Sequence, residues 1–214
     1  MVDIGYFMEV LDRMGSREVR EPKQQRSVEK RKRIIEAGFQ LFCEKGFHNT
    51  NTVEIAKLAG VSTGIVYNYF VDKKDIFIAA FDSYANSIAQ PMYKLLTTLE
   101  MPIDISAQVK QIIVMLSKSH NIAKSAHEEM EAMAHIDEDI RKYFCEFYAN
   151  LANTLVKTME GYGIKPTHAY EKVHIAINIV ENICHETVYH QHEYINYEVM
   201  TDEAVKIITD MLTS

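Results

Sequence analysis

The chain has 214 residues, 47% of them hydrophobic, and a formal net charge of −7 at pH 7. This length and apolar content suffice for one small domain joined to a larger one with a real core. No apolar run reaches the roughly 18 residues of a membrane span, and no basic start precedes an apolar segment, so we expect neither a membrane helix nor a secretory signal. Three widely spaced cysteines indicate reduced thiols in the cytoplasm.

The charge is distributed unevenly along the chain. Residues 26–74 contain nine Lys and Arg against five Asp and Glu, whereas residues 75–214 contain ten against twenty. A basic head on an acidic body is typical of a DNA-binding module fused to a regulatory domain. The acidic body repels phosphate and so directs the head toward DNA.

The N-terminal segment leaves its role open. Residues 1–14 have apolar side chains spaced for a short amphipathic helix, but we expect an extension of little consequence. Residues 15–26 combine basic side chains with Gly, Ser and Pro. They are interpreted as a flexible basic arm, of the kind that can enter a minor groove, or as a solvated linker.

Residues 27–45 predict the first firm helix, and two short helices joined by a tight turn follow it. Asn51 can accept a hydrogen bond from the amide of Glu54, and Glu54 can reach back, which makes a capping box. Gly60 supplies the left-handed residue that ends the first short helix, and Ser62 caps the second.

The second short helix, residues 63–70, has an unusual outer face. Val66 and Phe70 are spaced to face inward, while the outward positions lack the Lys and Glu of an ordinary surface helix. Such a pair can place a helix end in the DNA major groove, although capped helices and glycine turns occur in any small helical domain. The residues placed to meet base edges are Thr63, Gly64, Ile65 and Asn68.

The pattern of this region is long, ordered and without gaps. It includes Ile34, Ile35, Ala37, Leu41, Phe42, Lys45-Gly46-Phe47, Ile55-Ala56, Ala59-Gly60-Val61-Ser62, Gly64, Tyr67, Tyr69, Phe70 and Lys73. In this pattern, residues 30–77 closely resemble the DNA-binding domain of the tetracycline-repressor (TetR) family. Thr63, Asn68 and Val53 depart from the residues common there, which affects the DNA sequence preference and not the fold.

The resemblance implies three parts: an extension at 1–26, a helix-turn-helix domain at 27–74, and a ligand-binding and dimerisation body at 75–214. It also implies that the tyrosines and the lysine of the motif contact phosphate. The full set expected at double-stranded DNA, on a palindromic operator, is Thr50, Asn51, Thr52, Ser62, Thr63, Gly64, Ile65, Tyr67, Asn68, Tyr69 and Lys73.

The rest of the chain predicts helices and no strands, so the expected fold is all-α, with about nine helices in total. Asp72 should cap a helix from Lys73 to about Glu100, which Pro91 should kink or break near residues 87–90. Helices are further expected from Pro102 and Asp104, over 119–134 as one helix or two short ones, from Asp137 to the glycines at 161 and 163, over 167–190, and over 202–213.

The body should hold a dimer interface and an effector pocket. The helix at 167–190 is apolar on more than one side, so it and the helix at 202–213 are candidates for a four-helix interface in a homodimer, or they complete a monomer core. The resemblance implies a pocket for a small apolar or amphipathic effector. Its candidate lining, which is equally compatible with plain core, is Met115, Met130, Met133, Phe144, Phe147, Tyr148 and Met159.

Other functional classes receive little support. Cys184, His185, His190 and His192 lie near Glu181 and Glu186, but the zinc-protease spacing is absent and salt pairs along the helix are the better explanation. No phosphate loop or catalytic constellation is visible, so we expect no enzyme, cofactor or metal. The leading hypothesis is a ligand-responsive repressor. The alternative is an architectural or division-linked DNA-binding protein without a small-molecule effector.

Overall fold

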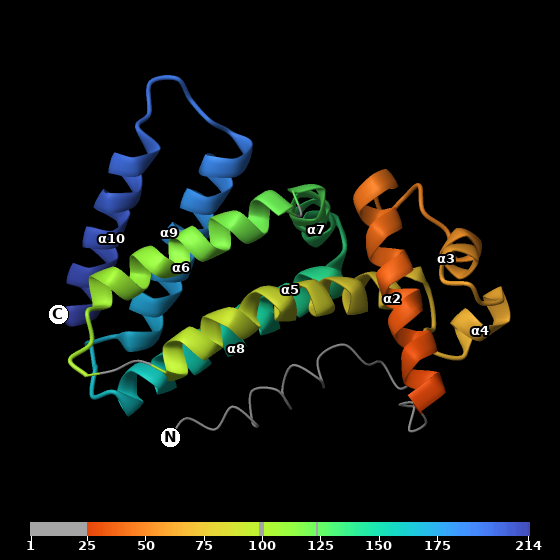
Figure 1. Ribbon diagram of the computed structural model, residues 1–214, viewed down its shortest axis with the longest axis horizontal. Coiled ribbons are helices and arrows are strands. Elements are labelled where there is room, and N and C mark those ends of the chain that lie inside the picture. The colour runs from red at the N-terminus through yellow and green to blue at the C-terminus, as the bar shows by residue number, and fades with distance from the viewer. Residues whose placement is uncertain (1–24, 99–100, 123) are drawn as a thin grey trace. The chain divides into compact units, whose positions relative to one another are not determined.

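The computed structural model describes residues 25–98, 101–122 and 124–214, and every regular element in them is an α-helix (Figure 1). The predicted all-α class is therefore confirmed. The segment before residue 25, with its possible amphipathic helix and most of its basic arm, lies outside the described residues. The helices are α2 Gln25–Lys45, α3 Thr52–Leu58, α4 Thr63–Tyr67, α5 Lys73–Thr97, α6 Ile105–Ile122, α7 Lys124–Ile136, α8 Glu138–Gly161, α9 Ala169–Tyr189 and α10 Tyr197–Thr213.

The chain divides into two compact units. The described part of the first, which we call the head unit, is residues 25–87 and 125–143. The described part of the second, the body unit, is residues 88–124 and 144–214 without the undescribed positions. α5 and α8 each contribute residues to both. The boundary between the units in α5 follows Ser87, whereas the expected boundary followed residue 74. The head unit also includes α7.

The head unit is built on aromatic packing. Phe42 of α2 meets Phe77 of α5 edge to face, with ring centroids 5.1 Å apart, and Phe77 packs on Phe81 at 4.3 Å. Gly38 lets the two helices approach, because a Cβ there would lie 2.6 Å from the Cγ2 atom of Ile76. α3 contacts α2, and α4 contacts α3. The aromatic packing of α2 therefore also helps to position the two short helices.

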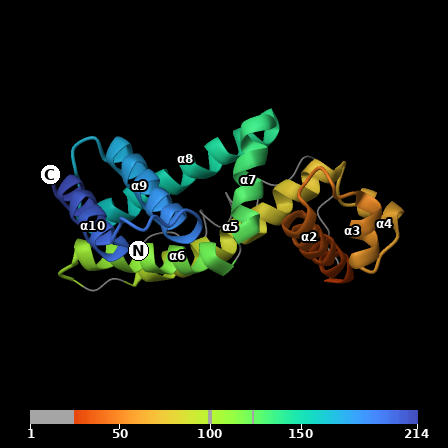
Figure 2. The same cartoon turned by 90° about the horizontal axis from the view of Figure 1, so that it is seen from above.

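The body unit is a packed layer of helices in which α6, α9 and α10 contact one another. Figure 2 shows α9 and α10 side by side, in agreement with Figure 1. Buried aliphatic residues from α6, α8, α9 and α10, among them Ile113, Val156, Val173 and Ile208, form one core. Within the described residues, none of the helices combines the length and apolarity that a membrane span needs.

Most of the helix boundaries follow from caps that the sequence predicts. Asp72 accepts the Asp75 amide at 2.9 Å where α5 begins, and Asp137 accepts the Asp139 amide at 3.0 Å where α8 begins. α5 continues as helix through Pro91, so the expected break does not occur. α10 begins five residues before the expected start, because Asn196 accepts the amides of the two helical residues Glu198 and Val199.

Candidate nucleic-acid interface and cavity

The start of α3 has the predicted cap. The side chain of Asn51 accepts the amides of Val53 and Glu54 at 3.1 and 3.0 Å. Glu54 also bonds the amine of Lys45 at 2.8 Å. The pKa of Glu54 is lowered, first by this lysine. The cap fixes α3 at the edge of the head.

α4 is a five-residue helix that is held by its apolar side. Val66 is fully buried and Phe70 is 3% exposed, as predicted. Ser62, Gly64 and Asn68 are exposed, while Thr63 and Ile65 are partly buried. Ser62 stands at the N-cap position without a side-chain hydrogen bond to the helix. The outer side of α4 is thus small, polar and open.

Gly64 is a glycine that the fold of the described residues does not require. A Cβ added there meets no atom within 4 Å, and its φ is not among the positive values found at Gly46, Gly60 and Gly163. A glycine inside a helix lowers stability relative to alanine by roughly 0.5–1 kcal/mol. Its presence at the exposed side of α4 therefore favours close approach of something outside the head.

The two tyrosines differ in their anchoring. Tyr67 is 53% exposed and its hydroxyl lies 3.2 Å from that of Thr52 on α3. Tyr69 is partly buried and its hydroxyl lies 2.7 Å from that of Ser27 on α2. Each tyrosine ties α4 or its following turn to another helix while leaving hydroxyl lone pairs available.

Thr50 and Lys73 face inward, which corrects the expectation that Thr50 contacts DNA. Thr50 is 2% exposed, and its hydroxyl lies 2.9 Å from the Gly46 carbonyl oxygen, because it closes the loop before α3. Lys73 donates to the carbonyl oxygens of Phe47 at 2.6 Å and Thr50 at 2.8 Å, and its amine lies 4.2 Å from the Phe47 ring centroid. Desolvation lowers the pKa of Lys73. Its first role is to hold this loop.

Two further links hold the same loop and the start of α5. The amide of Phe47 donates to the carboxylate of Glu129 on α7. The amine of Lys74 lies 2.7 Å from a carboxylate oxygen of Asp137 and 2.9 Å from one of Asp139. Burial acts to raise the pKa of Asp137, but hydrogen bonds from Lys74 and from backbone amides outweigh it and lower the value. α7 and the start of α8 thus belong structurally to the head unit.

The body unit contains an apolar cavity of about 150 Å³. The predicted stripe of α6 lines it, and aliphatic side chains of α5, α8, α9 and α10 complete its wall. The residues used below are Met92, Leu96, Gln108, Ile112, Thr158 and Glu181.

The lining differs from the one expected. Of the seven predicted residues, Met159 lines this cavity. Met130 and Met133 are buried in the head unit, and the other four, Met115, Phe144, Phe147 and Tyr148, are not part of its wall. Leu, Ile and Val side chains of five helices enclose the space, so methionine and aromatic content does not mark its wall.

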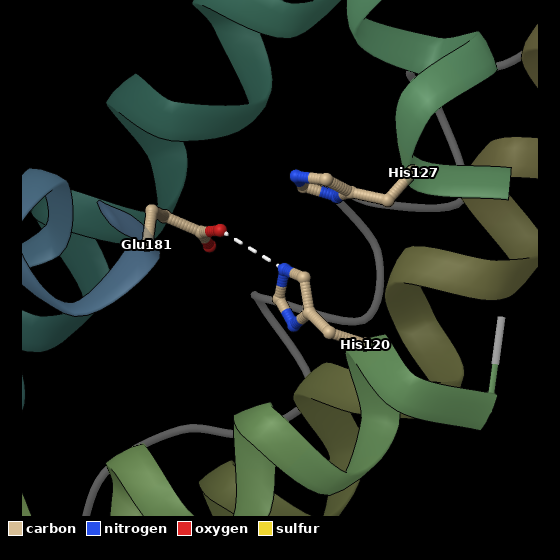
Figure 3. Close-up of side chains that lie close together, drawn as sticks. All are labelled: His120, His127 and Glu181. Atoms are coloured by element: carbon tan, nitrogen blue, oxygen red, sulfur yellow. Dashed lines mark ion pairs between the residues drawn. The ribbon is translucent and has the colours of Figure 1, made fainter. Parts of the chain in front are cut away.

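One ionisable pair lies at the cavity wall. The Nε2 atom of His120 is 3.2 Å from a carboxylate oxygen of Glu181 (Figure 3). The Nδ1 atom of His120 donates to the Leu116 carbonyl oxygen at 2.9 Å. A helical spacing of four residues would pair Glu181 with His185 and Glu186 with His190. Their ion pairs instead join Glu181 to His120 and Glu186 to His192, because the chain brings other histidines closer.

Comparisons with known proteins match the part of the chain that contains α2, α3 and α4. The family model of bacterial regulatory proteins, tetR family, matches residues 34–80. The regulator HbdR of Aromatoleum sp. (strain CIB) is 36% identical over 76 residues, which are 36% of this chain and 33% of that protein. The fatty acid metabolism regulator protein of Bacillus subtilis (strain 168) is 32% identical over 87 residues, 41% of each chain. Residues 34–80 are thus a tetR-family segment of the chain.

The fold resemblance extends beyond residues 34–80. A TetR-family regulator from Mesorhizobium loti MAFF303099 has a TM-score of 0.68 at 20% identity, covering 87% of this chain and 98% of that one. The fatty acid degradation regulator FadR from Bacillus halodurans has a TM-score of 0.60 at 19% identity, covering 91% and 97%. These likenesses show the fold. The sequence matches span about a third to two fifths of the two curated relatives.

The body unit leaves apolar side chains exposed on its last two helices. Ile175 of α9 is 49% exposed, and Val199 and Ile207 of α10 are each 54% exposed. Val199 and Ile207 are eight residues apart and so lie on one face of α10. The other sides of α9 and α10 supply the body core through residues such as Val173 and Ile208.

Sequence reasoning missed one feature of the head. Lys30, Arg31, Lys32 and Arg33 form a basic run in α2, and Lys32 and Arg33 are exposed. The guanidinium of Arg31 lies 5.4 Å from the Phe70 ring centroid. The net charge of the segment contained this signal, but the run was not assigned to phosphate.

Proposed function

We propose that the protein is a ligand-responsive transcriptional regulator of the repressor type, which binds a palindromic operator as a homodimer in the cytoplasm. α4 would enter the major groove, with Gly64 and Asn68 at base edges. The observation that carries this proposal is the exposed, small and polar face of α4 within the basic segment 26–74. The description of the matched family names regulatory proteins, which agrees with the expectation that the chain is not an enzyme.

Some contacts would position the protein on the DNA backbone, and others would recognise the base sequence. The hydroxyls of Tyr67 and Tyr69 and the basic run at 30–33 would contact phosphates, with Lys73 holding the loop before α3. Asn68 can pair with adenine, and Ile65 can touch a thymine methyl group. The backbone at Gly64 would pass close to the bases.

Dimerisation would use the exposed faces of α9 and α10. Ile175, Val199 and Ile207 supply the apolar centre, and two copies of this helix pair would make a four-helix interface. Two heads on one duplex would then read a twofold-symmetric site. This assignment refines the expected ranges of 167–190 and 202–213.

Effector control would act through α5. Met92 and Leu96 of this helix line the cavity, and residues 73–87 of the same helix belong to the head unit. Pro91 leaves the carbonyl oxygen of Ser87 without its usual helical partner, which weakens the helix at the division between the units. An effector that favours one conformation of the body would shift the population of head positions and release DNA.

Selection of duplexes from a random library by the full chain tests the proposal. We expect enrichment of a twofold-symmetric sequence, and an Asn68→Ala variant should lose preference at one base pair in each half-site. Enrichment without symmetry, or with the same preference in the variant, would contradict it. The architectural alternative is favoured only if sequences are bound without preference.

A further inference from the structure

The wall of the body cavity limits the charge of any molecule that it binds. Among the described residues that line it, none is Lys or Arg, and its one carboxylate, Glu181, already has His120 as a partner. An anionic ligand would be buried without a counter-charge and near a carboxylate, which is strongly unfavourable. A cationic ligand would have to compete with His120 for Glu181. The wall therefore favours an uncharged molecule.

The volume limits the size. Apolar cavities of about 150 Å³ stay dry and accept a molecule such as benzene. The volume of about 150 Å³ here is in the same range. A single ring or a chain of similar bulk fits the cavity without a large rearrangement.

One polar group at the wall lacks a partner. The Oε1 atom of Gln108 on α6 is buried and accepts no hydrogen bond from the part of the chain that the structure describes. Thr158, another polar residue of the wall, already donates to the Thr154 carbonyl oxygen at 2.8 Å. Buried polar atoms nearly always have a partner, so an unpaired carboxamide oxygen beside an empty apolar space indicates a ligand with a polar group. A hydroxyl suits it best, because it donates to Oε1 and, if the amide turns over, accepts from Nε2.

We propose that the cavity binds an uncharged, apolar molecule about the size of one aromatic ring, with a single hydroxyl group that hydrogen bonds to Gln108. This inference rests on the proposed function in one respect only, which is that the molecule would be the effector. Binding itself requires no DNA, so the two claims can fail separately.

Calorimetric titration of the full chain at pH 7 with phenol, toluene and benzoate tests the inference. These probes share one ring and differ in a hydroxyl, a methyl or a carboxylate. We expect phenol and toluene to bind and benzoate to bind at least tenfold more weakly than phenol. Gln108→Leu should lower the ratio of the toluene Kd to the phenol Kd by about tenfold, which is the size of effect that one buried hydrogen bond produces.

A variant that disturbs folding would weaken the binding of both probes, so the ratio of the toluene Kd to the phenol Kd isolates the hydrogen bond. Ile112→Val changes the same wall without touching a polar group and should leave the ratio unchanged. The inference is overturned if benzoate binds most tightly, if no probe binds, or if Gln108→Leu leaves the ratio unaltered. Phenol binding that depends on Gln108 but releases no operator DNA would support the ligand class and contradict the effector role.

Discussion

At the scale of single residues, Lys73 has a different function in the structure from the one that its place in the family pattern implies. The family pattern implies a phosphate contact, but its amine donates to the carbonyl oxygens of Phe47 and Thr50. We expect Lys73→Met to lower the free energy of unfolding by roughly 2 kcal/mol, because two carbonyl oxygens in a partly buried site lose a charged donor. Urea denaturation followed by circular dichroism measures this change.

Salt dependence separates the two roles of Lys73. A lost phosphate contact would lower the slope of log K against log salt by about 0.9, whereas a lost loop anchor leaves the slope unchanged. We expect an unchanged slope for Lys73→Met, with Lys32→Met as a matched control in which the slope falls. A reduced slope with unaltered stability would return Lys73 to the phosphate contacts.

Residues whose partners are close in sequence could be predicted, and residues with distant partners could not. The caps at Asn51, Asp72 and Asp137 follow from spacings of two or three residues, and the structure confirms them. The inward position of Thr50 and the orphaned carboxamide of Gln108 depend on tertiary packing. No local pattern signals either of them.

At the scale of elements, α7 is linked to the loop between α2 and α3. The Phe47 amide donates to Glu129. A Cβ atom added to Gly46 would lie 3.2 Å from the oxygens of the same carboxylate. We expect Glu129→Ala to increase the rate of hydrogen exchange at the Phe47 amide by more than tenfold, because the amide loses its partner. Exchange measured by NMR reports this amide directly.

The conservative variant supplies the control for α7. Glu129→Gln keeps an acceptor for the Phe47 amide, so its exchange should stay near that of the original protein. Rapid exchange in the Gln variant would mean that charge, and not the hydrogen bond, holds the loop. Equal protection in all three proteins would show that Glu129 does not anchor this loop.

The link between the starts of α5 and α8 should depend on pH. The pKa of Asp137 is lowered from its ordinary value of 3.8, so its stabilising contribution is complete above that value. It is lost as the pH falls through the lowered pKa of the folded state. The difference in unfolding free energy between the original protein and Lys74→Met should be constant from pH 7 to pH 5 and shrink below pH 4.

Urea denaturation at each pH measures this difference, and Asp137→Asn supplies the control. In the Asp137→Asn background, Lys74→Met should lower the free energy of unfolding at neutral pH by less than it does in the original protein. The size of this loss should also change less below pH 4. A cost of Lys74→Met that stays constant down to pH 3 would exclude a role for the carboxylate. Since these side chains are partly exposed, added salt should also reduce the effect.

Element prediction succeeded where capping and periodicity agree. The stripe Ile105, Val109, Ile112 and Leu116 predicts α6, and all four residues line the cavity. It failed at α9, which begins at Ala169 after His168 adopts a positive φ of 54°. A left-handed histidine has no sequence signature, so this start could not be predicted.

At the scale of the whole molecule, the exposed apolar residues of α9 and α10 predict the oligomeric state. We expect Ile207→Glu to convert a dimer into a monomer in analytical ultracentrifugation at micromolar concentration, because a charge would be buried at the interface centre. Ile136→Glu is the matched control, since Ile136 is 66% exposed on α7. A monomeric original protein, or a dimer that tolerates both changes, would remove this interface.

The sequence predicts the architecture better than the cavity. The head is predictable because turn glycines, caps and small exposed residues lie within about forty consecutive positions. The cavity needs five helices from a segment of more than a hundred residues, and its wall is ordinary aliphatic core by composition. Only its shape and the unpaired oxygen of Gln108 distinguish it.

The affinity of a Gly64→Ala variant for the selected duplex tests the central claim, that α4 meets DNA bases, most directly. The methyl group meets no atom of the described protein within 4 Å, so the variant should be as stable as the original, or slightly more so. Fluorescence anisotropy should show binding to the selected duplex weakened on the order of tenfold, with binding to a scrambled duplex unchanged. Equal affinity of the two proteins for the selected duplex would contradict the account.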